Sequence, residues 1–170
     1  MSDKKEMENV LTVRTSKTEG YNICFEKNFD KLAVCLEEQC RISERKICLV
    51  SYSNVVGLYG EEVSGLLAGA CMEFTSFVFE AGEGSKTLDT VRKLLEHLIL
   101  SRMERRDLIV ALGGGVVGDL AGYASAVYLR GIDYVQVPTT LLSQVDSSIG
   151  GKTGVYFDGY KNMVGAFHMP

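Results

Sequence analysis

Hydrophobic positions along the chain follow two alternating spacings. In some short segments apolar residues run continuously or at every second position, and in the segments between them they recur every three or four residues. The first spacing is typical of strands, which can be buried on both faces in a parallel sheet, and the second is typical of amphipathic helices. The expected strands are 10–15, 21–26, 46–51, 74–79, 107–112 and 134–137, and the expected helices are 29–40, 55–67, 88–100 and 120–129.

The first two expected strands should form a hairpin, because only a few residues, including Glu19 and Gly20, separate them. The strands and helices that follow alternate, which predicts right-handed crossovers and an open sheet. A length of 170 residues suits one domain. The sequence therefore predicts a single α/β domain over 1–170, with a Rossmann-like, mostly parallel sheet flanked by helices and an amino-terminal β-hairpin.

The segment after about Gly150 departs from this pattern. It reads GGKTGVYFDGYKNMVGAFHMP, which is rich in glycine and polar residues and has no periodic apolar face. Such exposed stretches usually serve a site. We expect a poorly ordered tail that belongs to an active site completed by residues outside this chain.

Composition narrows the class of protein. Hydrophobic residues make up 46% of the chain and the net charge is −4, so no basic surface for nucleic acid is expected. No apolar run approaches the roughly 20 residues that cross a membrane, and the opening MSDKKEMENV is too polar for a signal peptide. The five cysteines are odd in number and include no C-x-x-C pair, which favours a reduced, cytoplasmic protein.

The most distinctive local motif is GGGVVGD, which spans Gly113 to Asp119 between an expected strand and a helix. Its glycines satisfy G-x-G-x-x-G, and a helix start offers unpaired N–H groups to a phosphate. A tight turn that packs helix against strand explains the same glycines equally well. The motif comes late in the chain, so it is not the usual first turn of a dinucleotide-binding domain. Two possible P-loops fail, because Asp146 replaces the required first glycine of one and Ser85 interrupts the other.

Polar residues gather where expected strands end or loops begin. The carboxyl ends of parallel strands share one edge of a sheet, where ligands bind, although each residue alone could be a solvated charge or a helix cap, as Thr139 could be after Pro138. His97 lies off the apolar stripe of its helix and is expected in solvent, and the cysteines are expected to be core residues. With two histidines, the chain alone predicts no metal site. The polar residues at these positions are Glu83, Lys86, Asp119, Arg130, Thr139, Thr140, Asp146, Lys152, Lys161 and Asn162.

Four successive motifs resemble the signatures of the 3-dehydroquinate synthase family. They are GEGSKT (82–87), GGGVVGDLAGY (113–123), LRGIDYVQVPTTLLSQVDSSIGGKTGV (129–155) and YKNMVGAFHMP (160–170). The resemblance implies an amino-terminal NAD-binding half, followed in the complete enzyme by a mainly helical half that binds a divalent metal, usually zinc. It also implies a homodimer that converts 3-deoxy-D-arabino-heptulosonate 7-phosphate to 3-dehydroquinate and phosphate in the shikimate pathway.

The resemblance assigns roles to individual positions. Asp146, Lys152 and Asn162 match substrate-binding positions, and Arg130 matches a residue that reaches the substrate phosphate across a dimer interface. The matching cofactor-binding positions are Asn54, Glu83, Lys86, Gly114, Gly115, Val116, Val117, Gly118, Asp119, Thr139, Thr140 and Lys161.

Two departures qualify the resemblance. Tyr52 stands where an acid would take the adenosine ribose hydroxyls, so weak NAD binding is expected. The metal ligands of the family, one Glu and two His, match no position of this chain, so we expect no metal site and no activity from this chain alone. Another sugar-phosphate cyclase, such as 2-deoxy-scyllo-inosose synthase, a metal-dependent polyol dehydrogenase, and a non-catalytic nucleotide-binding fragment remain alternatives.

Overall fold

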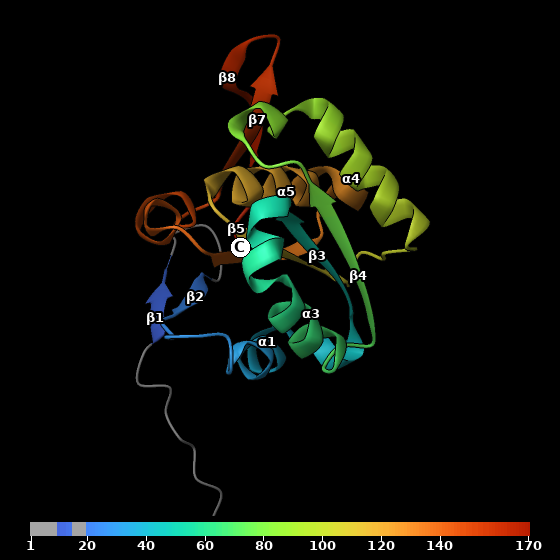
Figure 1. Ribbon diagram of the computed structural model, residues 1–170, viewed down its shortest axis with the longest axis vertical. Coiled ribbons are helices and arrows are strands. Elements are labelled where there is room, and N and C mark those ends of the chain that lie inside the picture. Colours follow the sequence, from blue (N-terminus) through green and yellow to red (C-terminus); the bar gives the residue numbers. More distant parts are fainter. Residues whose placement is uncertain (1–9, 15–19) are drawn as a thin grey trace, which may run out of the picture.

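The computed structural model describes residues 10–14 and 20–170 and has the expected α/β architecture (Figure 1). Its central sheet has four parallel strands in the order β4-β3-β5-β6. Two antiparallel hairpins flank it, β1–β2 near the amino terminus and β7–β8 at the carboxyl end. The strands are β1 (Val10–Val13), β2 (Tyr21–Cys24), β3 (Lys46–Tyr52), β4 (Glu73–Phe79), β5 (Leu108–Gly113), β6 (Asp133–Pro138), β7 (Lys152–Phe157) and β8 (Tyr160–Phe167).

Helices cover both faces of this sheet. Thr87 caps α4, since its hydroxyl accepts a hydrogen bond of 3.3 Å from the Thr90 amide. The helices are α1 (Leu32–Cys40), α2 (Ser53–Val55), α3 (Glu61–Ala68), α4 (Leu88–Leu100) and α5 (Gly115–Val127), with a π-helical turn (Val56–Gly60) joining α2 to α3, another at Ser143–Ser147, and 3-10 turns at Ile42–Glu44, Glu83–Ser85 and Tyr128–Arg130.

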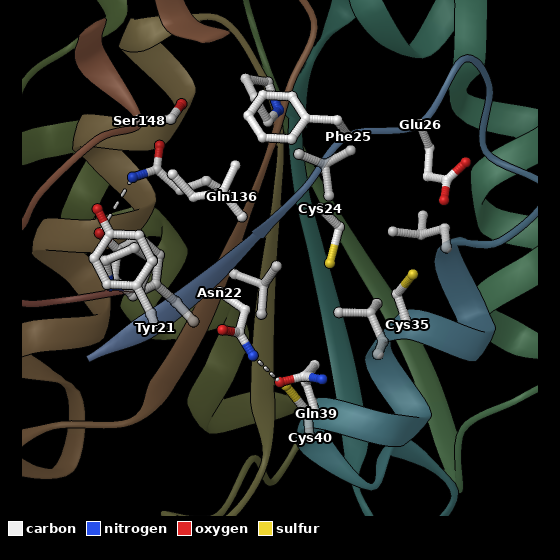
Figure 2. A pocket seen from close by; sticks show the side chains of 18 of the residues that line it. Tyr21, Asn22, Cys24, Phe25, Glu26, Cys35, Gln39, Cys40, Gln136 and Ser148 are labelled. Atoms are coloured by element: carbon white, nitrogen blue, oxygen red, sulfur yellow. Dashed lines mark hydrogen bonds between the residues drawn. The ribbon is translucent and has the colours of Figure 1, made fainter. Parts of the chain in front are cut away.

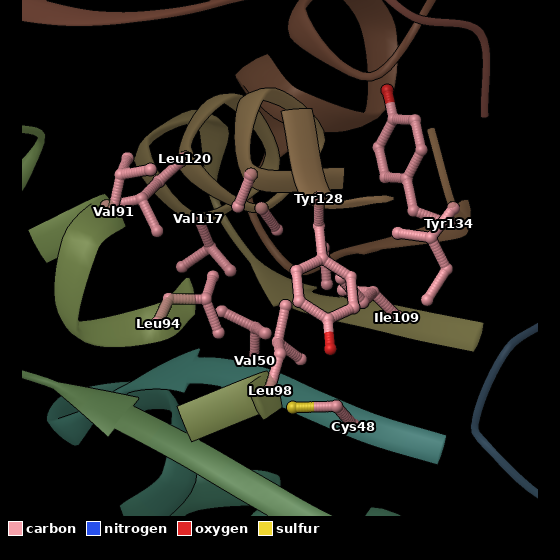
Figure 3. Packing of buried hydrophobic residues seen from close by; sticks show 14 of the residues in the cluster. Cys48, Val50, Val91, Leu94, Leu98, Ile109, Val117, Leu120, Tyr128 and Tyr134 are labelled. Carbon is pink, nitrogen blue, oxygen red and sulfur yellow. The ribbon is translucent and has the colours of Figure 1, made fainter. Parts of the chain in front are cut away.

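Alternate residues of β3 and β5 supply two separate cores. Cys48 and Val50 face α4 and α5, whereas Ile47 and Leu49 face α1 and α3. Figure 3 shows the first core, in which Val91, Leu94 and Leu98 of α4 pack with Val117 and Leu120 of α5 over the sheet. Because both strands are buried on both faces, their sequences are continuously apolar, which is why the pattern predicted them.

Several expectations about helices were wrong in detail, and α1 begins at Leu32, three residues after the expected start. Helix α5 begins at Gly115, five residues before the expected start, because GVVGD already forms its first turn. The expected helix 55–67 begins earlier, at Ser53, and contains the π-helical turn. His97 is half-buried, and its Nε2 lies 2.9 Å from the Thr75 hydroxyl. Burial lowers the pKa of His97. The expected strand end Thr15 and turn residue Glu19 lie outside the described residues.

The expected poorly ordered tail is instead the hairpin β7–β8. Val155 is fully buried in the first core, and the Thr153 hydroxyl donates to the Ala166 carbonyl at 2.9 Å. A Cβ at Gly165 would lie 2.2 Å from the Thr153 carbonyl oxygen, and one at Gly154 would lie 3.1 Å from the Val164 oxygen. These glycines therefore permit close contact between two strands, which a search for apolar periodicity does not detect.

Candidate functional site

The carboxyl ends of the four parallel strands form one edge of the sheet. Tyr52 of β3 pairs with Phe79 of β4, and Gly113 of β5 pairs with Pro138 of β6, so all four strands finish at the same level. In an open parallel sheet this edge is where ligands bind. The segments that leave it carry most of the residues expected to form the site.

The glycine motif is a packing turn as well as a helix start. A Cβ at Gly113 would lie 2.5 Å from Cγ2 of Val117, and a Cβ at Gly118 would lie 2.3 Å from Oε1 of Gln136. A Cβ closer than about 3 Å to another atom requires movement of a neighbour. The absence of a side chain at these two positions therefore lets the helix lie close to the sheet. Val117, assigned to the cofactor by resemblance, is fully buried in the core.

The middle of the motif faces the strand-end edge. Gly114 is the N-cap of α5, and Gly115 and Val116 occupy its first two helical positions, where amides lack an intrahelical partner. A Cβ at Gly114 would lie 3.2 Å from Cγ2 of Thr140, and one at Gly115 would lie 2.9 Å from Oγ of Ser147. A side chain at either position would occupy the space beside these amides. The turn can therefore admit a phosphate group to the helix start.

Two hydroxyl groups beside this turn have no hydrogen-bond partner in the described part of the chain. They are Oγ1 of Thr139 and Oγ of Ser147, and both atoms are buried. The Thr139 backbone is fixed, since its amide donates to the Gly113 carbonyl at 3.0 Å. Buried hydroxyls normally find partners, so these two fit a ligand rich in oxygen atoms. Ser147 was not among the residues expected from the sequence.

Thr139 does not cap the following helical turn, as was considered possible. The cap is Thr140, whose Oγ1 accepts a hydrogen bond of 3.2 Å from the Ser143 amide. The difference follows from chain geometry, because a cap accepts from the amide two or three residues later. Thr139 is therefore left with its hydroxyl beside the glycine turn.

A buried lysine joins three segments at this edge. Lys86 forms an ion pair with Asp119 of α5, and its Nζ donates to Oδ1 of Asn162 at 2.7 Å. The Lys86 side chain is 7% exposed and that of Asp119 21%. Burial raises the pKa of Asp119, and the ammonium of Lys86 opposes that rise. Asn162 adopts a left-handed backbone conformation with φ 55°, which asparagine tolerates better than most residues.

A second layer of contacts lies outside this lysine. Lys161 Nζ is 3.3 Å from Oε1 of Glu83, and the Tyr156 hydroxyl donates to the same carboxylate. Of the residues expected from the sequence, the structure thus joins Glu83, Lys86, Asp119, Lys161 and Asn162 in one cluster. Tyr156 was missed, because one aromatic residue in a glycine-rich segment gives no distinctive signal.

Among the expected site residues outside this cluster, four have exposed side chains without a partner in the part of the chain that the structure describes. Asn54, Arg130, Asp146 and Lys152 are exposed, and within residues 10–14 and 20–170 their side chains make no hydrogen bond or ion pair. Tyr52, the residue in place of an acid, packs its ring edge against Phe79 at 6.2 Å between centroids.

The two histidines are apart from the cluster and serve packing. His168 stacks on Tyr134 with ring centroids 5.3 Å apart, and its Nε2 lies 2.8 Å from the Ile132 carbonyl. No group of three or more His, Cys, Asp or Glu residues within the described ranges could hold a metal ion. In the same ranges no helix is long and apolar enough to cross a membrane.

A groove of about 1310 Å³ runs along β6, between that strand, the β1–β2 hairpin and α1 (Figure 2). Asn22 and Gln39 hydrogen-bond across it at 2.8 Å, and the Tyr21 hydroxyl accepts from the Gly150 amide at 2.8 Å. Thr139 borders this groove, but the cluster around Lys86 does not. The groove therefore meets the strand-end site at Thr139 and excludes the Lys86 cluster.

Comparison with known proteins places the chain in one family. Residues 76–170 match the family described as 3-dehydroquinate synthase N-terminal. The chain is 43% identical over 157 residues to the 3-dehydroquinate synthase of Ruminiclostridium cellulolyticum, covering 91% of this chain and 42% of that protein. It is 55% identical over 126 residues to the enzyme of Streptococcus thermophilus, covering 74% and 36%. The chain thus spans about two fifths of the length of the curated relatives it matches.

Solved structures of sugar-phosphate cyclases share the fold. A 2-deoxy-scyllo-inosose synthase, complexed with carbaglucose-6-phosphate, NAD+ and Co2+, has a TM-score of 0.85 at 29% identity over 95% of this chain and 44% of its own. The 2-epi-5-epi-valiolone synthase of Streptomyces hygroscopicus, with NAD+ and Zn2+ bound, has a TM-score of 0.72 at 33% identity over 86% and 42%. With the family match over more than half of its residues, this chain belongs to the 3-dehydroquinate synthase family as its amino-terminal, Rossmann-like domain.

Proposed function

We propose that this chain is the NAD-binding domain of a 3-dehydroquinate synthase. The whole enzyme would convert 3-deoxy-D-arabino-heptulosonate 7-phosphate to 3-dehydroquinate and phosphate, and it would act in the cytoplasm as a homodimer. The observation that carries the proposal is the strand-end site, where an open glycine turn, two unpartnered hydroxyls and the Lys86 cluster converge in a chain of this family.

The dinucleotide fits the glycine turn. Its pyrophosphate would lie against the amides of Gly114, Gly115 and Val116, where the start of α5 favours negative charge. The hydroxyls of Thr139 and Ser147 would gain partners from the same ligand. NAD, when bound, supplies the acceptor and donor of hydride for the reaction. Tyr52 offers one hydroxyl where a carboxylate would accept two ribose bonds, so binding to this chain should be weak.

Lys86 and Asp119 would set the charge beside the reacting end of the cofactor. The ammonium is buried and donates to two oxygens of the chain before any ligand binds. Preorganised charge of this kind stabilises developing negative charge without reorganisation. Asn162 joins this pair to the hairpin β7–β8, so the cofactor side and the assigned substrate side share one hydrogen-bond network.

The substrate roles remain assignments by family. Lys152 would offset the anionic charge of the substrate, Asp146 and Asn162 would hold ring hydroxyls, and Arg130 would reach the phosphate from the partner subunit. Asp146, Lys152 and Arg130 are exposed and without partners in the described chain, which leaves them available to a ligand or a second chain. The divalent metal would be held by the helical half, since the described residues offer no ligand group for it.

A second candidate function is that of a 2-deoxy-scyllo-inosose synthase, because such an enzyme has a TM-score of 0.85 with this chain. The two activities differ in substrate, so turnover discriminates them. The complete gene product should release phosphate from the heptulosonate phosphate and form 3-dehydroquinate, with NAD and a divalent metal present. Binding of carbaglucose-6-phosphate, the compound complexed with that synthase, without turnover of the heptulosonate phosphate would instead favour the alternative. In that complete protein Lys152→Ala should lower kcat/KM at least about a hundredfold, since a desolvated charge contact contributes several kcal/mol.

A further inference from the structure

The ring of Tyr156 lies between two lysine side chains of the candidate site. Its centroid is 5.6 Å from Nζ of Lys86 and 5.4 Å from Nζ of Lys161. Both distances are within the range over which an ammonium is attracted to an aromatic face. The hydroxyl of the same residue donates a hydrogen bond to Glu83, which also pairs with Lys161. One side chain therefore contacts three charged residues.

The backbone holds this ring in place independently of the side-chain contacts. The Tyr156 amide donates to the Lys86 carbonyl at 2.8 Å, and Tyr156 forms a parallel bridge with Thr87. The preceding residue, Val155, is fully buried in the core. A change of the Tyr156 side chain should therefore leave the hairpin β7–β8 attached to the domain.

Among the described residues, three groups surround the Lys86 ammonium. Asp119 and Asn162 accept its hydrogen bonds, and the Tyr156 ring lies within cation–π distance. An ammonium has three N–H donors on a flexible stem. A ring face beside it offers no conventional hydrogen-bond acceptor, so fewer orientations of the ammonium satisfy its donors. Lys161 is 69% exposed, and its contacts within the described chain are the Glu83 carboxylate and the Tyr156 ring. Without the ring, both cations would be less restricted.

We propose that Tyr156 is a positioning residue of the dinucleotide site: by contacting Lys86, Lys161 and Glu83 together, it fixes both cations and so determines affinity for the anionic cofactor. The inference rests on the proposed binding of NAD at the strand-end edge. Tyr156 itself need not touch the cofactor. Its effect on binding is transmitted through the two lysines.

The variants Tyr156→Leu and Tyr156→Phe separate the ring from the hydroxyl. Leucine removes both, and the loss of two cation–π contacts should raise the Kd for NAD about tenfold. Phenylalanine keeps the ring and should restore the Kd to within about threefold of the parent chain. Tyr160→Leu is the matched control, because Tyr160 lies on the same hairpin, is 66% exposed and makes no side-chain contact with the cluster among the described residues. Its Kd should be unchanged.

Calorimetric titration of NAD into the 170-residue chain and these variants gives the affinities, with circular dichroism to confirm folding. Equal Kd values for the parent chain and Tyr156→Leu would overturn the proposal. A rise as large in Tyr160→Leu would also overturn it, because the effect would then belong to the hairpin as a whole.

Nuclear magnetic resonance of the chain with 13C-labelled lysine tests the positioning without NAD. Protons on Cε of Lys86 and Lys161, assigned through Lys86→Arg and Lys161→Arg, should show ring-current shifts in the parent chain and in Tyr156→Phe but not in Tyr156→Leu. If the parent chain binds no NAD, the proposed function fails while these shifts still decide whether Tyr156 positions the lysines. Identical lysine shifts in all three proteins would refute the positioning role.

Discussion

Replacement of Lys86 by methionine tests the buried ion pair on which the candidate site is built. Methionine keeps most of the length of the side chain and removes its charge. In the variant the Asp119 carboxylate, 21% exposed, loses its cation, and Asn162 loses the donor to its side-chain oxygen. The rest of the pocket should remain packed, because methionine adapts to irregular spaces.

The expected cost is about 2–3 kcal/mol of unfolding free energy. Removal of one partner of a fully buried pair typically costs about 3–5 kcal/mol. Two features reduce that figure. Asp119 is partly exposed, and rotation of the Asn162 side-chain amide would present its N–H group to the Asp119 carboxylate. For a domain of this size each kcal/mol lowers the melting temperature by about 2–4 °C, so a fall of about 4–12 °C is expected.

The cost should depend on pH through Asp119. Burial raises the pKa of this carboxyl in the folded chain, and Lys86 opposes the rise, so in Lys86→Met the folded pKa is higher still. A carboxyl whose folded pKa exceeds its unfolded value of about 3.9 contributes stability at low pH that is lost as the pH rises through the folded pKa. The deficit of the variant against the parent should therefore be largest near pH 7 and shrink toward pH 4.

Urea unfolding of both proteins between pH 4 and pH 8 measures this difference. Lys93→Met is the matched control, since Lys93 is 57% exposed in a surface pair with Asp89 and should change stability by less than about 0.5 kcal/mol. In Lys86→Met with Asp119→Asn, much of the pH dependence should vanish. A deficit below about 0.5 kcal/mol, or one that is the same at all pH values, would contradict the buried-pair interpretation.

Three further predictions follow from other parts of the structure. Gly165→Ala should destabilise the chain by about 2 kcal/mol or more, because its Cβ meets the Thr153 carbonyl oxygen at 2.2 Å. Gly65→Ala has free space around its Cβ and should be neutral or stabilising by up to about 1 kcal/mol, and thermal unfolding of both variants measures the difference. Burial raises the pKa of Cys48 to about 12, so peptide mapping after treatment with a thiol reagent should find it unlabelled until the chain unfolds, and rapid native labelling would show that the core is open. The 170-residue chain alone should bind no stoichiometric zinc and release no phosphate from the heptulosonate phosphate. Metal analysis that finds one zinc per chain, together with phosphate release above background, would disprove this.

The sheet could be predicted from the sequence because burial dictates its pattern. The strands β3 and β5 lie between two helical layers, so both of their faces are apolar. Helix α4 shows a clear stripe because only one of its faces is buried. The start of α5 was placed too late, because the glycines that suggested a loop are the ones that let Val117 of α5 pack on Gly113 of β5 and let Gly118 of α5 pack on Gln136 of β6.

The carboxyl-terminal hairpin could not be predicted from apolar periodicity. Its strands contact each other through Gly154 and Gly165, where the absence of a side chain is the structural requirement. The site was predicted in part, since Lys86, Asp119 and Asn162 do converge. The place of Tyr156 depends on the hairpin, so no local sequence signal identifies it.

The central claim is that a dinucleotide binds against the start of α5. Titration of NAD into the 15N-labelled chain, followed by amide NMR, tests it most directly. Saturable shifts should appear at the amides of Gly114, Gly115 and Val116, and Gly115→Val should abolish them because its side chain would fill the space between the turn and Ser147. Absence of saturable shifts at these amides, or shifts confined to groove residues such as Ile23 and Val135, would contradict the account.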